Sequence, residues 1–152
     1  MNRKRGFTLI EVLAVVVILG VLTSIALPQY RKAILRAQAA NALINLKTIF
    51  DSAKRSYAMS GQWPAALTDL DIKFFEADEN GNVGEFQYVL DSTNKYASAC
   101  RLGETGLCLK AYYKRNNVRD VYTCEYSGEN AAKYQAVCES LGECSQGVCI
   151  IE

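Results

Sequence analysis

The sequence predicts an α+β protein, in which a long N-terminal helix packs on a small antiparallel β-sheet and disulfides pin the C-terminal region. Three observations predict this fold class. Apolar residues fill positions 7–27 and then recur every three or four residues as far as Tyr57. Beyond position 85, apolar and polar residues alternate in short runs, as they do in half-buried strands. All six cysteines lie in the last third of the chain.

The apolar run at positions 7–27 has the length of a membrane span. At about 1.5 Å per residue, a helix over this run would be about 31 Å long, close to the hydrocarbon thickness of about 30 Å. An ordinary signal peptide has a shorter apolar core followed by a small-residue cleavage site, and no such site follows this run. Arg3, Lys4 and Arg5 precede the run and are expected to hold its N-terminal end in the cytoplasm. A plain single-span anchor would explain all of these features.

A plain anchor does not explain the Gly6-Phe7 junction or the carboxylate of Glu11. A charged side chain inside a spanning helix costs roughly 2.5 to 3.5 kcal/mol, so Glu11 is expected to acquire a partner of opposite charge. No Lys, Arg or His lies between Phe7 and Leu27. The partner is therefore expected on another molecule or at a new chain terminus, which cleavage after Gly6 would supply as the Phe7 amine.

The hexapeptide at positions 6–11, Gly-Phe-Thr-Leu-Ile-Glu, resembles the class III signal of type IV pilins and the related pseudopilins. The resemblance covers about the first third of the chain and includes Pro28 and Tyr30 after the apolar run. It implies that a prepilin peptidase cleaves after Gly6 and methylates the new amine of Phe7. It also implies that Glu11 and Pro28 serve in assembly.

The same resemblance implies a structural protein rather than an enzyme. Residues 1–6 would be a leader peptide, and 7–28 the transmembrane and assembly half of the helix. The chain would begin as a single-pass inner-membrane precursor in contact with lipid, with its head in the periplasm. An inner-membrane assembly platform would then pass it into a helical polymer of identical or related pilin subunits, a cell-surface pilus that serves adhesion, motility or DNA uptake. An alternative is a pseudopilin of a type II secretion system, which shares this anchor.

Residues 29–59 are expected to continue the helix as an amphipathic half that packs on the head. The predicted buried face comprises Leu35, Ala39, Ala42, Leu43, Leu46, Ile49, Phe50, Ala53 and Tyr57. Polar residues such as Arg36, Asn41 and Asp51 fill the positions between. Pro28 lacks an amide hydrogen and Gly20 is a weak helix former, so the turns between them are expected to bend or melt, unless Pro28 produces only a mild kink.

Residues 60–152 are expected to form the globular head. The helix should stop at positions 60–64, Ser-Gly-Gln-Trp-Pro, and a turn-rich loop follows at 78–82. Asp78, Asn80 and Asn82 alternate there as calcium ligands do, but the glycine and the distal glutamate of an EF-hand are missing from their places, which favours a solvated turn.

Strands in the head are expected near 86–90, 107–113 and 118–126, with a hairpin turn at 115–117 joining the last two. This pattern indicates an antiparallel sheet of three or four strands. Residues 129–138 should form a short helix or a turn, and a cysteine-pinned tail follows to the end.

The six cysteines are expected to form three disulfides, because an even number of thiols on the translocated side of a membrane meets an oxidising compartment. A zinc site is the alternative, but the sequence has no Cys-x-x-Cys pair and no histidine. The sequence alone does not choose among the connectivities. Nearest neighbours are the proposed pairing: Cys100 with Cys108, Cys124 with Cys138, and Cys144 with Cys149.

The composition argues against catalysis, a cofactor or a metal centre. The chain has no histidine, and it therefore lacks the commonest general base and the commonest metal-binding nitrogen. Its formal net charge is +1, from 17 basic and 16 acidic residues, and without the three basic residues of 1–6 the side chains sum to 14 − 16 = −2. This balance gives no strong attraction to nucleic acid.

A minor pilin whose head binds DNA is a further alternative. Its basic edge and stacking surfaces would comprise Arg101, Lys110, Lys114, Arg115, Arg119, Tyr112 and Tyr113. A solvated strand edge explains the same cluster more simply, since lysines at a sheet edge also deter aggregation.

Overall fold

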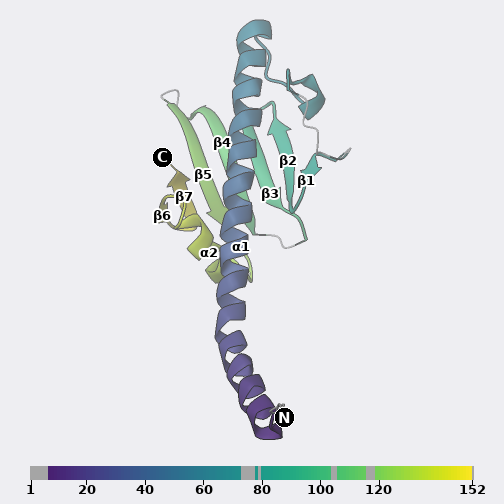
Figure 1. The fold of residues 1–152 in the computed structure, drawn as a ribbon. Coiled ribbons are helices and arrows are strands. Elements are labelled where there is room, and N and C mark those ends of the chain that lie inside the picture. The colour runs from purple at the N-terminus through teal and green to yellow at the C-terminus, as the bar shows by residue number, and fades with distance from the viewer. Residues whose placement is uncertain (1–6, 73–77, 79, 104–105, 116–118, 152) are drawn as a thin grey trace. The chain divides into compact units, whose positions relative to one another are not determined.

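The computed structural model describes residues 7–72, 78, 80–103, 106–115 and 119–151. The chain divides into two compact units, Met1–Leu35 and Arg36–Glu152. Helix α1, Leu9–Ser60, contributes to both of them (Figure 1). The predicted helix is confirmed, and it ends at Ser60, immediately before the Gly-Gln-Trp-Pro sequence that was expected to stop it.

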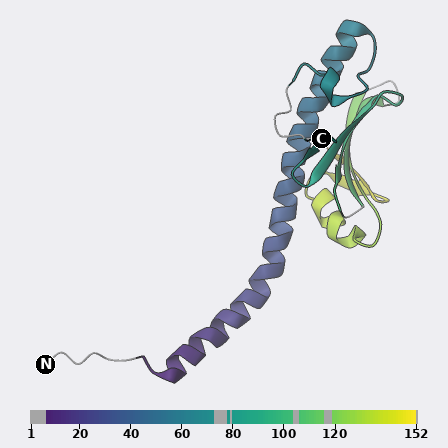
Figure 2. The same ribbon diagram turned by 90° about the vertical axis from the view of Figure 1, so that its right-hand side faces the viewer.

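Within the second unit, α1 buries the apolar face that its spacing predicts. Of the nine residues assigned to this face, eight lie in this unit; seven of these are buried and Tyr57 is half-buried. Leu35, the last residue of the first unit, is buried as well. Leu46, Phe50 and Ala53 have no exposed surface at all. Figure 2 shows this part of the helix lying along one face of the β-sheet. The three- and four-residue spacing therefore places one apolar stripe against the sheet, as in an amphipathic helix that covers a core.

The sheet contains seven antiparallel strands within the described residues, in the order β1-β2-β3-β4-β5-β7-β6 (Figure 1). The strands are β1 (Asn82–Val83), β2 (Phe86–Asp91), β3 (Tyr96–Arg101), β4 (Leu107–Arg115), β5 (Arg119–Tyr126), β6 (Glu143–Ser145) and β7 (Val148–Ile151). The three predicted strands are present as β2, β4 and β5, but the expectation of three or four strands in all is wrong. The α+β fold class is confirmed with a larger sheet.

Strand β2 shows why the alternation of apolar and polar residues predicts strands in this sheet. Phe86, Tyr88 and Leu90 are buried, while the residues between them are half-buried or exposed. Successive side chains of a strand point to opposite faces, so one face of β2 packs on the core and the other faces outward. Strand β4 pairs with β5 in antiparallel register from Leu107 with Tyr126 to Arg115 with Arg119, which agrees with the predicted hairpin; its turn residues 116–117 lie outside the described residues.

The C-terminal region is more regular than predicted. Helix α2, Ala131–Cys138, occupies the segment expected to be a short helix or turn. The expected irregular tail is instead a hairpin, in which β6 pairs with β7 and β7 pairs with β5. Three disulfides join Cys100 to Cys108, Cys124 to Cys138, and Cys144 to Cys149, and none of the cysteines is free.

A cluster of aromatic rings fills the space between α1 and strands β4 and β5. The ring of Phe50 lies 5.9 Å from that of Trp63 and 5.7 Å from that of Tyr122, measured between centroids. The rings of Tyr57 and Tyr113 lie 5.5 Å apart, and both also contact Trp63. These tilted and edge-to-face pairs stabilise the packing beyond the area that they bury. Tyr57 of α1 therefore belongs to the packed interface between the helix and the sheet.

One polar contact fixes the segment that follows α1. Ser52 is fully buried on the helix and its hydroxyl donates a hydrogen bond to the carboxylate of Asp71. Arg55, one turn further along, donates two hydrogen bonds of 2.9 Å to the same carboxylate through Nε and Nη2. These hydrogen bonds, with that of Arg55 the larger effect, lower the pKa of Asp71 from 3.8 to about 2.

The depressed pKa of Asp71 predicts an acid-dependent loss of stability. Because the pKa is lower in the folded than in the unfolded chain, the contribution of Asp71 is complete above about pH 4 and is lost as the pH falls toward about 2. We expect Asp71→Asn to be less stable than wild type at pH 7 and to approach it at pH 2. Urea unfolding followed by Trp63 fluorescence measures both proteins, and an equal difference at both pH values would contradict the ion pair.

The loop that holds Asp78 is built by its own carboxylate. Oδ1 of Asp78 accepts the backbone N–H groups of Asn80 at 2.9 Å and Asn82 at 2.8 Å, and Oδ2 accepts the side-chain amide of Asn82 at 2.8 Å. A carboxylate that is engaged in this way closes a turn rather than presenting oxygens to a cation. Among the described residues no group of acidic, cysteine or histidine side chains has the arrangement of a metal site. The geometry agrees with the solvated turn rather than with a calcium loop.

Candidate functional site

The N-terminal end of α1 holds Glu11 in a reciprocal hydrogen-bond arrangement with Thr8. Oε2 of Glu11 accepts hydrogen bonds from the backbone N–H of Thr8 at 2.9 Å and from its hydroxyl at 2.8 Å. The backbone N–H of Glu11 in turn lies 3.4 Å from the hydroxyl oxygen of Thr8. This is a capping box, in which a Thr and a Glu three residues apart satisfy the free amide groups of the first helical turn.

Glu11 thus has hydrogen-bond partners within its own chain, which the absence of basic side chains between Phe7 and Leu27 does not predict. The local signal for them is a threonine three residues before a glutamate at the start of an apolar run, a recognised helix-start pattern. The positively charged partner expected for Glu11 stays a prediction. Thr8 supplies two hydrogen bonds but no positive charge, so the cost of a carboxylate in lipid is reduced and not removed.

Phe7 precedes the helix and 80% of its surface is exposed in the isolated chain. Gly6 and the basic residues before it lie outside the described residues. The structure therefore places one of the two residues of the predicted cleavage junction, Phe7, two positions before Leu9, the first residue of α1.

The first unit has no core of its own. Every residue from position 7 to 34 is exposed, including the large apolar side chains that follow Phe7. Within the described residues, α1 is the single helix long and apolar enough to cross a membrane. An apolar surface of this extent is not stable in water, so lipid or other helices must cover it.

The polar groups inside the apolar segment are satisfied by the helix itself. The hydroxyl of Thr23 donates to the carbonyl oxygen of Leu19 at 2.7 Å, and the hydroxyl of Ser24 donates to that of Val21 at 2.7 Å. Pro28 lies inside α1, and the helix includes the residues on both sides of it. The local melting expected between Gly20 and Pro28 is therefore not present in the isolated chain, where every residue of these turns is helical. A loss of helical order inside a filament stays a prediction.

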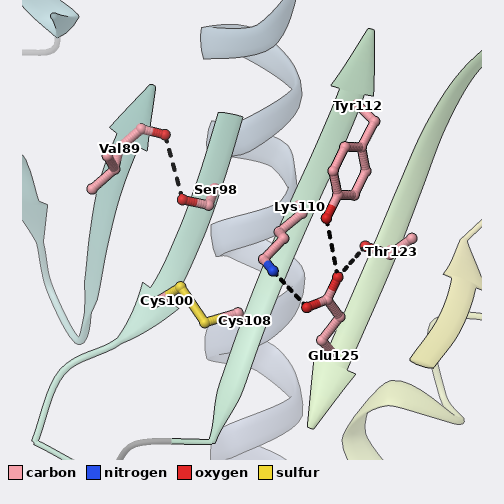
Figure 3. Close-up of a disulfide and its surroundings, with 8 residues drawn as sticks. All are labelled: Val89, Ser98, Cys100, Cys108, Lys110, Tyr112, Thr123 and Glu125. Carbon is pink, nitrogen blue, oxygen red and sulfur yellow. Dashed lines mark hydrogen bonds and ion pairs between the residues drawn. A yellow bond between two sulfur atoms is a disulfide. The ribbon is translucent and has the colours of Figure 1, made fainter. Parts of the chain in front are cut away.

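The residues proposed as a basic DNA-binding edge do not form one cluster. Lys110 lies on the sheet face that points away from α1, where its Nζ contacts Oε2 of Glu125 at 2.6 Å (Figure 3). Partial burial disfavours the charge on Lys110, but the hydrogen bond and the charge of Glu125 outweigh it and raise the pKa of Lys110. Arg101 lies at the end of β3, and its Nη2 is 3.9 Å from Oε2 of Glu85.

The two candidate stacking tyrosines point in opposite directions. Tyr112 lies on the same outward face as Lys110 (Figure 3). Its ring is 5.3 Å from that of Tyr96, measured between centroids. Tyr113 faces α1 and packs against Tyr57. Adjacent residues of a strand always face opposite sides, so these two rings do not make one stacking surface. Lys114 and Arg119 are exposed near the end of this hairpin, while the side chain of Arg115 lies outside the described residues.

Comparison with known proteins points to the N-terminal segment. Residues 1–27 match the prokaryotic N-terminal methylation motif. The chain is 44% identical over 62 residues to a fimbrial protein of Moraxella nonliquefaciens, which covers 41% of this chain and 38% of that protein. It is 32% identical over 87 residues to a fimbrial protein of Neisseria meningitidis, covering 52% of this chain and 51% of the other.

A third relative extends the same pattern to another genus. The type IV major pilin protein PilA of Myxococcus xanthus is 34% identical over 80 residues, which cover 53% of this chain and 34% of that protein. The chain thus spans about half, or less, of the length of the curated relatives that it matches.

Proposed function

We propose that this chain, which carries the N-terminal methylation motif and resembles type IV pilins, is a structural subunit of a type IV pilus. The observation that carries the proposal is the motif at residues 1–27 together with relatives named as type IV major pilins. The predicted resemblance is itself confirmed by these matches. The fully exposed apolar half of α1 supports a subunit that is covered first by lipid and then by neighbouring helices.

The precursor stage begins in the inner membrane. A prepilin peptidase cleaves between Gly6 and Phe7 and methylates the new amine, while the apolar segment stays in lipid. The head, with its three disulfides, lies in the oxidising periplasm. An assembly platform in the inner membrane then supplies subunits to the base of the filament.

Assembly replaces lipid around α1 by the α1 helices of other subunits. The Glu11 carboxylate of one subunit pairs with the Phe7 amine of its neighbour, and this pairing neutralises a charge that the Thr8 hydrogen bonds leave in place. Contacts between unlike surfaces of identical subunits do not close, so they propagate into a helical polymer. The filament exposes its heads at the cell surface.

The names of the relatives favour a pilus over a secretion pseudopilus, since they are fimbrial proteins and major pilins. The DNA-binding alternative loses its main support, because Lys110 and Arg101 contact Glu125 and Glu85 rather than standing free. The head is best described as the structural exterior of the filament.

Sheared surface filaments should contain this chain beginning at a methylated Phe7. Mass spectrometry of the intact subunit measures both the loss of residues 1–6 and the methyl group. A bulky replacement such as Gly6→Leu should leave the uncut precursor in the membrane and no subunit in the sheared fraction, because the peptidase site accepts only a small residue there. A native product that starts at Met1 and remains in the membrane as a monomer would refute the proposal.

A further inference from the structure

Two basic residues lie shortly after the apolar segment of α1. Arg31 and Lys32 are the first charged residues after Glu11, and both are exposed. Neither forms an ion pair with any part of the chain that the structure describes. Tyr30, beside them, is 64% exposed. Two cations and an aromatic residue therefore stand at the end of the apolar segment of α1, and neither cation has an ionic partner among the described residues.

The helix geometry places these cations at the level of lipid phosphates. At about 1.5 Å per residue, Arg31 lies about 6 Å and Lys32 about 7.5 Å beyond Leu27. The polar headgroup region is about 5 to 8 Å thick on each side of the hydrocarbon core. Tyrosine favours this interface, and long basic side chains extend along the helix to keep their charges in it.

The apolar segment of α1 in a second copy does not offer a matching acid at this level. The sequence has no aspartate or glutamate between Glu11 and Asp51, so helices side by side in the same membrane present no carboxylate near Arg31 and Lys32. Phosphate groups of the surrounding lipid are the anions that remain. Juxtamembrane lysine and arginine residues are attracted to anionic lipid surfaces by the same electrostatics.

We propose that Arg31 and Lys32 bind the headgroups of anionic phospholipids in the membrane leaflet next to the head. The proposal rests on the membrane-inserted stage of the proposed function. Bound lipid would hold the unassembled subunit at a fixed depth, with Glu11 at a constant level inside the bilayer. Incorporation into a filament would then require these headgroups to leave.

The test uses the full chain beginning at Phe7, reconstituted into nanodiscs of phosphatidylcholine with a minor share of phosphatidylglycerol. Native mass spectrometry of the protein released from the nanodiscs measures how many molecules of each lipid species stay bound to it. We expect phosphatidylglycerol to be enriched over its share in the disc, by about fivefold for each cation at low salt. The double variant Arg31→Gln/Lys32→Gln should return the bound ratio to that of the disc.

Matched variants separate this site from a general effect of charge. Lys133→Gln/Arg119→Gln removes the same charge from exposed positions of the head and should keep the enrichment. The exchanged pair Arg31→Lys/Lys32→Arg should keep it as well, because only charge and reach matter. Raising the salt to about 1 M, where the Debye length is about 3 Å, should reduce it. Millimolar inorganic phosphate should not displace the lipid.

Each contrary outcome has a distinct meaning. Equal retention of both lipids by wild type, or enrichment that survives Arg31→Gln/Lys32→Gln, overturns the lipid site and leaves the pilus proposal intact. Displacement by millimolar phosphate would show a general phosphate site and overturn the lipid assignment. A wild-type chain that does not enter the bilayer at all would count against the proposed function itself.

Discussion

Glu11→Gln is expected to leave the subunit inserted in the membrane and to abolish or strongly reduce its incorporation into filaments. The amide keeps the size and the hydrogen-bonding groups of the side chain but removes its negative charge. Gln is accepted at this position of a capping box, so the first turn of α1 should stay formed. The loss of filaments would therefore report the missing charge that the Phe7 amine of a neighbour needs. The measurement is subunit recovered in sheared filaments against subunit in the membrane fraction.

Two further variants separate charge from helix capping. Thr8→Ala removes the cap and leaves the carboxylate, and we expect it to assemble nearly as wild type, since a lost cap costs only about 1 kcal/mol of helix stability. Glu11→Ala removes the charge together with the Glu11 half of the capping box, and it should fail to the same degree as Glu11→Gln. If Thr8→Ala and Glu11→Ala fail together while Glu11→Gln assembles, the role of Glu11 is to start the helix, and the pairing between subunits is wrong.

The sequence predicts those parts of the fold in which one residue pattern dominates. Along α1 the apolar spacing alone identifies Leu46 and Phe50 as core residues, because one side of the helix meets the sheet and the other meets water. In β2 the buried residues Phe86 and Tyr88 alternate with more exposed residues, and this alternation gives the strand and its inner face. Each of these elements has one buried face, and only then do apolar residues recur in the sequence at the spacing of a helix or a strand.

Strand β3 is buried on both faces at its centre, and the sequence pattern does not predict it. It lies between β2 and β4, and Ala97, Ser98 and Ala99 are all buried although they point to opposite faces. Small residues on both faces leave no alternation of apolar and polar character to detect. Its position depends on side chains of neighbouring strands that the local sequence does not reveal.

The β6–β7 hairpin did carry a local signal. Gln146 and Gly147 connect the two strands with φ angles of 50° and 83°, as expected for a two-residue turn with both residues left-handed. A glycine at the second position of such a turn is common, and the sequence between Cys144 and Cys149 fits it. The two cysteines that flank this turn indicate a cross-link as well, and a cross-link alone does not specify a hairpin. At the candidate site, Thr8 contributes hydrogen bonds and no charge, so a search for opposite charges does not identify it.

Removing the disulfide between Cys124 and Cys138 should destabilise the head more than any other single cross-link. It joins β5 to α2, it closes the longest of the three loops with a sequence separation of 14, and neither cysteine has exposed surface. Loss of the cross-link costs about 3 kcal/mol in the chain-entropy model, which corresponds to a melting temperature lower by about 10 to 15 °C for a unit of this size. Alanine is used in Cys124→Ala/Cys138→Ala because serine would bury unpaired hydroxyl groups at these positions. The measured loss of stability then reflects the cross-link and the packing of its sulfurs.

The chain provides its own probe and its own control for this measurement. Trp63 is the single tryptophan and is 6% exposed, so its fluorescence in the detergent-solubilised full chain reports unfolding of the head. Cys100→Ala/Cys108→Ala removes a shorter cross-link between paired residues of β3 and β4, on the outward face, where the sheet hydrogen bonds remain (Figure 3). It should therefore cost less, about 2.5 kcal/mol. Peptide mapping of the unreduced wild type establishes the pairing first; a different connectivity, or a larger loss in the control, would contradict the assignment of Cys124–Cys138 as the principal cross-link of the head.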